Sequence, residues 1–163
     1  MDDVVTGARV GVTVPVDLPR ERVWELVTDV ARYGDWSPEC DHTEWVEGGG
    51  PKVGARFTGH NTISDEVSFT TVCVVTEVRQ YESFAWVVLD GAEDVRRPGS
   101  TWRYELVPGA DGGTLLRQTF EHGPGDSGAR RAADRDPAAM AARLAQLCEN
   151  MTTSITRMVA GEK

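Results

Sequence analysis

The strongest constraint on the fold is a change of hydrophobic period near residue 136 of this 163-residue chain. Between residues 42 and 122 apolar side chains recur at every second position, a pattern typical of half-buried strands. Beyond residue 136 they recur every three or four positions, which is typical of one long amphipathic helix. A run of strands followed by such a helix predicts an α+β fold, with the helix packed on an antiparallel sheet.

Seven segments have the composition and alternation of strands: 8–16, 42–47, 53–63, 68–78, 83–90, 100–107 and 114–122. In the sixth of these, Trp102, Tyr104 and Leu106 share one face. In the last, the residues that share a face are Leu116, Gln118, Phe120 and His122. Pro15 favours an edge position or a strand end, because proline donates no ladder hydrogen bond. Residues 48–51, GGGP, predict a hairpin turn.

Two helical regions frame the strands. Residues 20–30 place Val23, Trp24, Val27 and Val30 on one stripe, and a second, short helical turn is expected within 31–41. The long helix begins after Asp136-Pro137. Its apolar stripe contains Met140, Leu144, Leu147, Cys148, Met151, Ile155, Met158 and Val159. The opposite face is predicted to hold Arg143, Gln146, Glu149, Asn150, Thr153 and Arg157.

The connection 123–135 is polar and rich in glycine, which favours a mobile loop. Its arginines, Arg130, Arg131 and Arg135, are interpreted as solvated, with a lid over a cavity as the alternative. Residues 125–128, GDSG, resemble the nucleophile region of trypsin-like proteases. The chain is too short for that double barrel, and His122 lies too close in sequence, so the flexible-loop interpretation is preferred.

Composition excludes several classes of function. The net charge of −9 argues against a nucleic-acid partner and against binding to an anionic membrane surface. We expect no membrane insertion, since no apolar stretch reaches about 18 residues. The three cysteines form no C-x-x-C pair and the three histidines have no metal-ligand spacing, so neither a metal nor a cofactor is expected. A reduced, cytoplasmic protein with a single domain spanning 1–163 is predicted.

Several stretches together resemble the START-like or SRPBCC superfamily, which includes the polyketide cyclase/dehydrase and lipid-transport family. They are PRERVWELVTDVARYGDWSP (19–38), VGARFTGHN (53–61), FAWVV (84–88), TWRYEL (101–106) and GGTLLRQTF (112–120). The resemblance implies a helix-grip fold, in which a curved, seven-stranded antiparallel sheet surrounds a long C-terminal helix, with two short helices after the first strand. It also implies an internal cavity for lipids, quinones or aromatic polyketides. Where relatives often carry an acidic residue on the last strand, this chain has Gln118.

Candidate site residues follow from the faces expected to line that cavity. The ligand-binding candidates are Trp36, Asn61, Trp86, Trp102, Gln118, Phe120, Met140, Leu144 and Met151. The catalytic candidates are His122, Tyr104 and His60, because a histidine can transfer a proton and a tyrosine can stabilise an enolate. His60 and Asn61 cannot both face inward on a regular strand, and Asn61 is preferred because it shares parity with Phe57.

Two main hypotheses about function are compatible with these residues. The first is an enzyme that cyclises, dehydrates or rearranges an aromatic polyketide-like or lipid-like molecule by holding one reactive conformer. The second is a carrier or sensor that holds a hydrophobic small molecule unchanged. A partner subunit with a vestigial pocket is a third hypothesis. The oligomeric state is expected to be a monomer or a homodimer.

Overall fold

The computed structural model describes residues 3–46, 49–89 and 94–162. The strands are β1 (Arg9–Val16), β2 (Cys40–Trp45), β3 (Arg56–Ser64), β4 (Val67–Arg79), β5 (Ser83–Leu89), β6 (Ser100–Pro108) and β7 (Thr114–His122). The helices are α1 (Arg20–Val27), α2 (Tyr33–Trp36), α3 (Gly128–Arg135) and α4 (Ala138–Ala160). Short 3-10 turns occupy Val30–Arg32 and Ala110–Gly112. Parts of three predicted segments lie outside the described residues: the strand end at Glu47, the turn at Gly48 and the strand end at Asp90.

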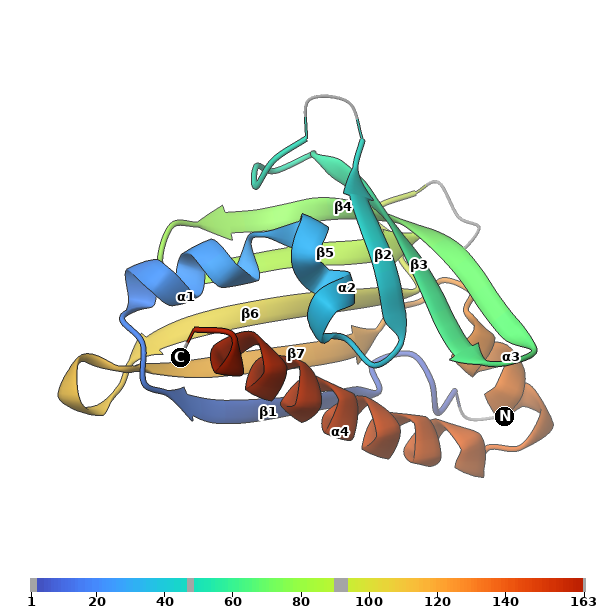
Figure 1. Cartoon of the computed structure of the whole chain (residues 1–163). Coiled ribbons are helices and arrows are strands. Elements are labelled where there is room, and N and C mark those ends of the chain that lie inside the picture. The colour runs from blue at the N-terminus through green and yellow to red at the C-terminus, as the bar shows by residue number, and fades with distance from the viewer. Residues whose placement is uncertain (1–2, 47–48, 90–93, 163) are drawn as a thin grey trace.

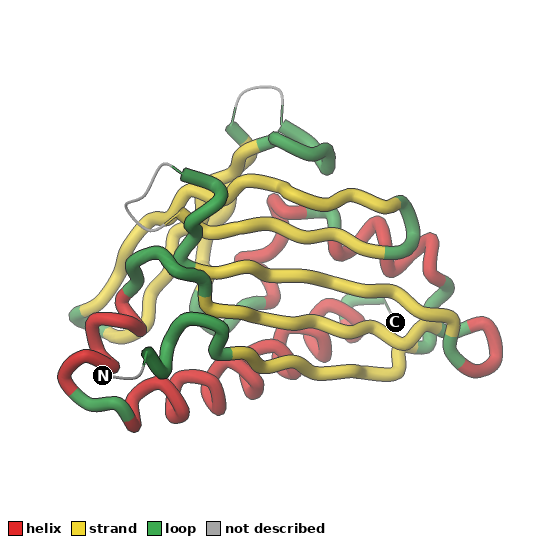
Figure 2. The backbone as a smooth tube through the Cα atoms, turned by 180° about the vertical axis from the view of Figure 1, so that it is seen from behind, coloured by secondary structure: helices red, strands yellow, loops and turns green. Residues whose placement is uncertain are grey.

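The strands form one antiparallel sheet in the order β1-β7-β6-β5-β4-β3-β2. Figure 1 shows the sheet curving around the helices, with α4 running along its β1 side. Seen from behind, in Figure 2, the strands lie in front of the helices. The predicted α+β helix-grip fold is therefore confirmed, as is the edge position of the strand that contains Pro15.

The core lies between the concave face of the sheet and the helices. The stripe predicted over residues 20–30 is buried: Val23 and Val27 on α1, and Val30 on the 3-10 turn that follows, expose 1% or less of their surface. The C-terminal half of α4 joins the same core through Ile155 and Met158. Burial of these apolar side chains provides the main driving force for docking both helices on the sheet. None of the helices in the described ranges is long and apolar enough to cross a membrane.

The connection 123–135 differs from the prediction of a mobile loop. Residues 128–135 form helix α3, which packs against the start of α4. Ser127 caps it by accepting a hydrogen bond from the Arg130 backbone amide at 2.9 Å. The segment contains three alanines, which favour a helix even though its glycine and charged residues suggest a loop. Ala133 is buried in the same apolar cluster as Met140. The prediction of a mobile loop was therefore wrong for this half of the connection.

Of the three arginines predicted to be solvated, Arg131 and Arg135 are exposed, whereas Arg130 is largely covered. The Arg130 guanidinium donates to the carbonyls of Gly123 at 3.0 Å and Gly125 at 3.1 Å, and it pairs with Asp3 at 3.2 Å. Arg131 pairs with Asp126 at 2.6 Å. These contacts attach the segment 123–127 to the helix that follows it and to the N-terminal segment.

Close packing of α2 on β2 gives a testable prediction. A Cβ on Gly34 would lie 2.6 Å from the Asp41 carbonyl oxygen, a backbone atom that cannot turn aside. Gly34→Ala should therefore lower the free energy of unfolding by about 1–3 kcal/mol, measured by urea denaturation. Gly50→Ala, where a Cβ meets nothing within 4 Å, is the matched control and should change stability far less. Equal effects of the two substitutions would contradict the close packing.

Candidate functional site

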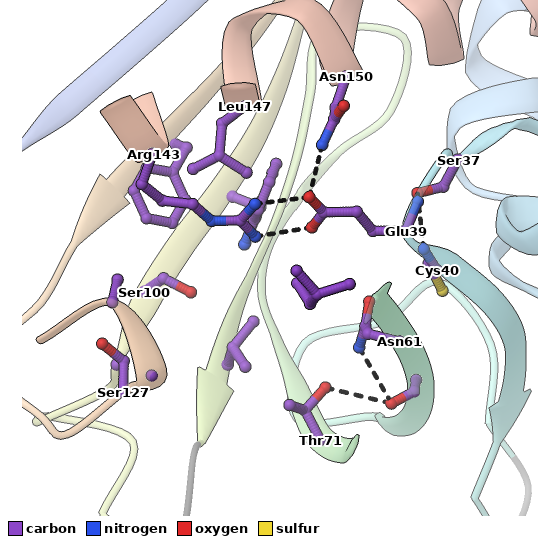
Figure 3. A pocket seen from close by; sticks show the side chains of 18 of the residues that line it. Ser37, Glu39, Cys40, Asn61, Thr71, Ser100, Ser127, Arg143, Leu147 and Asn150 are labelled. Carbon is purple, nitrogen blue, oxygen red and sulfur yellow. Dashed lines mark hydrogen bonds and ion pairs between the residues drawn. The ribbon is translucent and has the colours of Figure 1, made fainter. Parts of the chain in front are cut away.

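A cavity of about 680 Å³ lies between the concave face of the sheet and helices α3 and α4. Its volume falls within the range of small-molecule sites, about 300–1,000 Å³. The inward residues of successive strands line it, because side chains alternate between the two faces of a strand. On β3, for example, Phe57, Gly59, Asn61 and Ile63 face the cavity. Figure 3 shows part of this lining from close by.

Aromatic rings form the wall of the cavity on the sheet side. The rings of Trp86 and Trp102 are stacked, with centroids 6.4 Å apart and planes 6° apart. Phe120 meets Trp102 edge to face at 5.1 Å, and Phe57 meets Trp86 at 5.9 Å. Flat, polarisable surfaces of this kind favour flat apolar ligands, which can lie against them over a large area.

Two polar side chains lie within this aromatic wall. Tyr104 on β6 and Gln118 on β7 are direct cross-strand partners, and each is 5% exposed. The Gln118 Oε1 atom is buried without a hydrogen-bond partner, and the Tyr104 hydroxyl has none among the described residues. The half-buried Tyr33 differs, since its hydroxyl donates to the Val27 carbonyl. Burial raises the pKa of Tyr104, so its phenol stays neutral and remains a donor.

His122 lies at the α3 end of the cavity and is 1% exposed. Its Nδ1 atom is 2.8 Å from the Gly123 carbonyl, which can only accept, so Nδ1 carries the proton. Its Nε2 atom is 2.5 Å from Ser127 Oγ, which therefore donates to it. Burial lowers the pKa of His122, and the nearby Arg130 charge acts in the same direction. Both ring nitrogens are thus engaged within the protein.

Two cysteines that line the cavity are unsuited to nucleophilic chemistry. Burial raises the pKa of Cys40 to about 11 and that of Cys73 to about 12. Both side chains therefore remain thiols near neutral pH, whereas the reactive form of cysteine is the thiolate. The third cysteine, Cys148, is also free.

A polar bridge crosses between α4 and the segment before β2. Arg143 donates two hydrogen bonds to the Glu39 carboxylate, at 2.5 and 2.6 Å, and Asn150 donates a third at 2.8 Å (Figure 3). All three residues line the cavity. The bidentate geometry fixes both the register and the orientation of the two elements.

The β3–β4 hairpin provides an apolar rim. Ile63, Val67 and Phe69 line the cavity and are also 43%, 48% and 40% exposed, so this side of the cavity is open to solvent. An apolar ligand that approaches here meets apolar contacts before it reaches the aromatic wall. In Figure 1 the tip of this hairpin lies beside α3.

The structure brings most of the predicted site residues together. The cavity is lined by Trp36, Asn61, Trp86, Trp102, Tyr104, Gln118, Phe120, His122 and Met151. His60 is outside the lining: its Nδ1 atom contacts the Asp41 carboxylate at 2.6 Å, on a side chain that is 41% exposed. The strand alternation that turns Asn61 inward turns His60 outward, as the preference for Asn61 anticipated.

Met140 and Leu144 are also outside the lining. Both pack in a cluster with Val5 and Phe120, beneath the N-terminal half of α4. The apolar stripe of α4 covers β1 at the edge of the sheet, and a neighbouring stripe faces the cavity. Met151 lies at the boundary and belongs to both.

Sequence reasoning missed Glu39, Arg143, Asn150 and Ser127. Arg143 and Asn150 were assigned to a face opposite the apolar stripe, although both face the cavity. Their spacing of seven residues places them on one side of the helix, and this was a usable signal. No comparable signal identified Glu39, because its partners are more than 100 positions away in the sequence.

The sequence matches the family model for polyketide cyclase / dehydrase and lipid transport over residues 7–154. The chain therefore belongs to that family. No curated protein matches the sequence at a significant level.

Several solved structures have a similar fold. The Polyketide_cyc-like protein Cgl2372 from Corynebacterium glutamicum is 28% identical, with a TM-score of 0.58 over 96% of this chain and 89% of that one. Ginseng major latex-like protein 151 from Panax ginseng is 12% identical, with a TM-score of 0.66 over 94% and 95%. Protein Ms6760 from Mycobacterium smegmatis is 18% identical, with a TM-score of 0.59 over 94% and 90%. The last two show the fold alone.

The polar bridge predicts energetic coupling between Glu39 and Arg143. Their side chains are 18% and 27% exposed, so solvent screens the pair only in part. A double-mutant cycle with Glu39→Ala and Arg143→Ala should give a coupling free energy of about 1 kcal/mol. The exposed pair Arg96 and Asp94 is the control and should show much weaker coupling. Similar coupling in the two pairs would contradict a bridge that fixes α4.

The buried imidazole predicts a pH-dependent stability. Burial holds the pKa of His122 below its ordinary value of 6.5. As the pH falls below 6.5, the unfolded chain binds a proton at this residue before the folded chain does, so the free energy of unfolding decreases. His122→Asn should therefore show a shallower decrease than the wild type just below pH 6.5, measured by urea denaturation. Carboxylates titrate in both proteins and cancel in the comparison. Identical slopes would show that His122 does not stay neutral in the folded state.

Proposed function

We propose that this protein binds a flat, mostly apolar molecule, aromatic polyketide-like or lipid-like, and catalyses its cyclisation, dehydration or rearrangement. The observation that carries the proposal is the pair of Tyr104 and Gln118 inside the aromatic wall: within the described part of the chain, neither the buried Gln118 Oε1 atom nor the Tyr104 hydroxyl has a hydrogen-bond partner. A buried polar atom without a partner costs about 1–3 kcal/mol. A ligand that supplies the partner recovers that free energy on binding.

The chemistry of the pair specifies what the ligand offers. A neutral phenol donates best to a carbonyl or phenolate oxygen, and an amide oxygen accepts from a hydroxyl or N–H group. Directly opposed residues on neighbouring strands have Cβ atoms about 4.5–5.5 Å apart, so both groups can contact adjacent positions of one ligand. A carbonyl next to a hydroxyl, as in an enolisable hydroxy-ketone, fits this arrangement.

Catalysis in such a site rests on orientation and on electrostatics. The stacked rings of Trp86 and Trp102 hold a flat substrate in one conformer, which supports ring closure by proximity. Tyr104 stabilises the negative charge that develops on a carbonyl oxygen as an enolate forms, while the α-proton passes to water that enters at the solvent-exposed rim of the cavity. In this cyclisation or dehydration His122 has no assigned role in proton transfer, because its two nitrogens are engaged by Gly123 and Ser127.

A carrier or sensor of a hydrophobic small molecule is the second candidate. The engagement of both His122 nitrogens favours it, as does the neutral Gln118 on the last strand. A carrier needs apolar walls and an orienting group, and it needs no group that titrates. Both candidates share the same binding geometry, and they differ in whether the bound molecule is released changed.

Removal of either polar group tests the binding geometry. Tyr104→Phe and Gln118→Met keep the volume of each side chain and remove its hydrogen bond. Each should weaken binding about two- to tenfold. The measurement is calorimetric titration with the tightest binder from a panel of aromatic polyketides, quinones, sterols and fatty acids. His60→Ala, outside the cavity, is the control and should bind normally.

Mass spectrometry of the ligand recovered from the same variants decides between the candidates. An enzyme predicts that Tyr104→Phe lowers turnover at least tenfold, and a carrier predicts that the ligand returns unchanged from every variant. Unchanged affinity in both Tyr104→Phe and Gln118→Met would contradict the proposed orientation of the ligand.

A further inference from the structure

A hydroxyl and an imidazole meet at the α3 end of the cavity, away from Tyr104. Ser127 Oγ donates to His122 Nε2 at 2.5 Å, and His122 Nδ1–H is oriented by the Gly123 carbonyl at 2.8 Å. This is the relation between a nucleophile, a base and a group that orients the base. Four residues, 123–126, separate the histidine from the serine, and the bend that they form brings the two side chains together.

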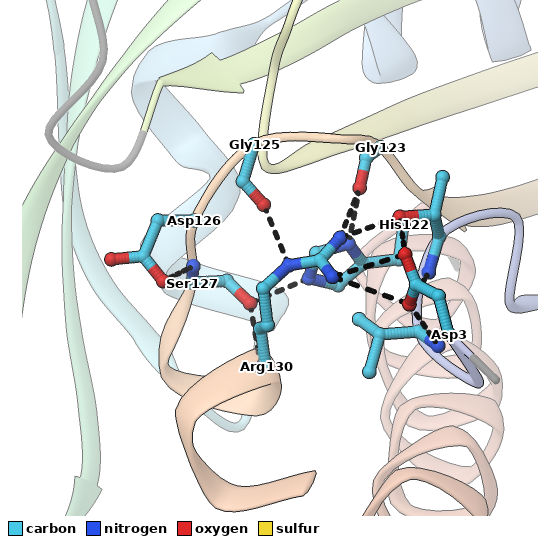
Figure 4. Close-up of polar contacts among 9 residues, drawn as sticks. Asp3, His122, Gly123, Gly125, Asp126, Ser127 and Arg130 are labelled. Carbon is cyan, nitrogen blue, oxygen red and sulfur yellow. Dashed lines mark hydrogen bonds and ion pairs between the residues drawn. The ribbon is translucent and has the colours of Figure 1, made fainter. Parts of the chain in front are cut away.

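The orientation of the pair is fixed from outside the cavity. Arg130 donates to the Gly123 carbonyl at 3.0 Å, and the same guanidinium pairs with Asp3 at 3.2 Å (Figure 4). The carbonyl that positions the imidazole is therefore itself held by a cation, and that cation is held by the N-terminal segment. The bond between His122 and Ser127 is preorganised by contacts that a ligand does not have to supply.

Capping of α3 accounts for only half of the Ser127 hydrogen bonding. The cap requires an acceptor, and Ser127 Oγ accepts from the Arg130 amide at 2.9 Å. The hydroxyl proton is directed at a base that is 1% exposed, and the serine lines the cavity. Ser37 provides an internal reference, since it also lines the cavity and accepts from the Cys40 amide at 2.9 Å. Within the described residues, no imidazole contacts Ser37.

We propose that Ser127 is a nucleophile, activated by His122, for acyl transfer from an ester or thioester of an apolar acid bound in the cavity. The inference uses the cavity of the proposed function but assigns a separate activity at its other end. The apolar walls would hold the acyl chain or ring system. The two cavity thiols, Cys40 and Cys73, do not compete, because burial keeps them protonated.

The reaction balances with water as the only co-reactant. Ser127 Oγ attacks the acyl carbon while its proton passes to His122 Nε2. The tetrahedral intermediate collapses, the bond to the alcohol or thiol breaks, and the imidazolium protonates that leaving group. Water then attacks the acyl-serine and gives a proton to His122. The acid leaves, and the imidazolium returns the proton to Ser127 Oγ.

The start of α3 supplies donors for the oxyanion. Gly128 and Ala129 follow the serine directly and line the cavity with it. The first amides of a helix have no intrahelical acceptor, and the helix dipole makes this end positive. The charge that develops on the acyl oxygen next to Ser127 is therefore met by backbone N–H groups.

An apolar fluorophosphonate tests the nucleophile without knowledge of the natural ligand. A long-chain alkyl fluorophosphonate loses fluoride on attack by an activated serine and leaves a stable adduct. Intact-mass and peptide mass spectrometry of the full chain should find one adduct, on Ser127, with Ser37 unmodified. Because this measurement is made on the wild-type protein, its outcome does not depend on whether any variant folds.

Three variants separate nucleophilic from structural roles. Ser127→Asp keeps a cap acceptor for α3 but should abolish labelling and lower hydrolysis of p-nitrophenyl esters at least tenfold. His122→Asn keeps a donor for the Gly123 carbonyl but removes the base, and should slow labelling at least tenfold. Ser64→Ala is the matched control, since Ser64 accepts from the Glu66 amide outside the cavity, and it should label as the wild type does.

The outcomes distinguish this inference from the proposed function. No adduct on Ser127, together with normal ligand binding, would overturn the nucleophile and leave the cavity proposal standing. Labelling of Ser127 that His122→Asn does not slow would overturn activation by His122. An adduct on Ser127 in a protein that binds none of the panel compounds would support the nucleophile and count against the proposed ligand class.

Discussion

The structure depends on where the apolar stripe of α4 is buried. Ile155 and Met158 enter the main core, and Met140 and Leu147 pack beneath the other half of the helix. This packing places α4 along β1, at the edge of the sheet. The centre of the concave face therefore has no apolar helix stripe to cover it, and a cavity of about 680 Å³ remains. The interior of this fold is hollow because its longest helix is anchored to one side.

The cavity has three kinds of polar group, which differ in how far the protein itself satisfies their hydrogen bonds. Glu39 and Arg143 satisfy each other and tie α4 to the segment before β2. His122 and Ser127 satisfy each other but leave the hydroxyl beside the cavity. Gln118 Oε1 has no hydrogen-bond partner among the residues that the structure describes. The unpaired atom indicates where a ligand contributes free energy, because a buried acceptor without a donor is costly.

Much of the fold and part of the site could be predicted from the sequence. Strand alternation shows which residues share a face, so the sequence alone predicts that Trp102, Tyr104 and Gln118 line the cavity. The rotation of α4 about its axis was not predictable, because periodicity shows which residues share a stripe but not what the stripe covers. Met140 and Arg143 were consequently assigned to the wrong environments. Helix α3 was missed because the glycines and charged residues of the connection 123–135 outweighed a serine cap and three alanines in the interpretation of its sequence.

The central claim is that the cavity holds an apolar small molecule, and a cavity-filling variant tests it most directly. A Cβ on Gly59 would meet only atoms at 3.7–3.9 Å, among them side-chain atoms of Thr71 and Asn61, which line the cavity. Gly59→Phe therefore places a ring in the cavity while the backbone is retained. Native mass spectrometry after incubation with the ligand panel should show one ligand per wild-type chain and little or none on the variant. Equal occupancy of the two proteins would contradict the account, since the ligand would then lie outside the cavity.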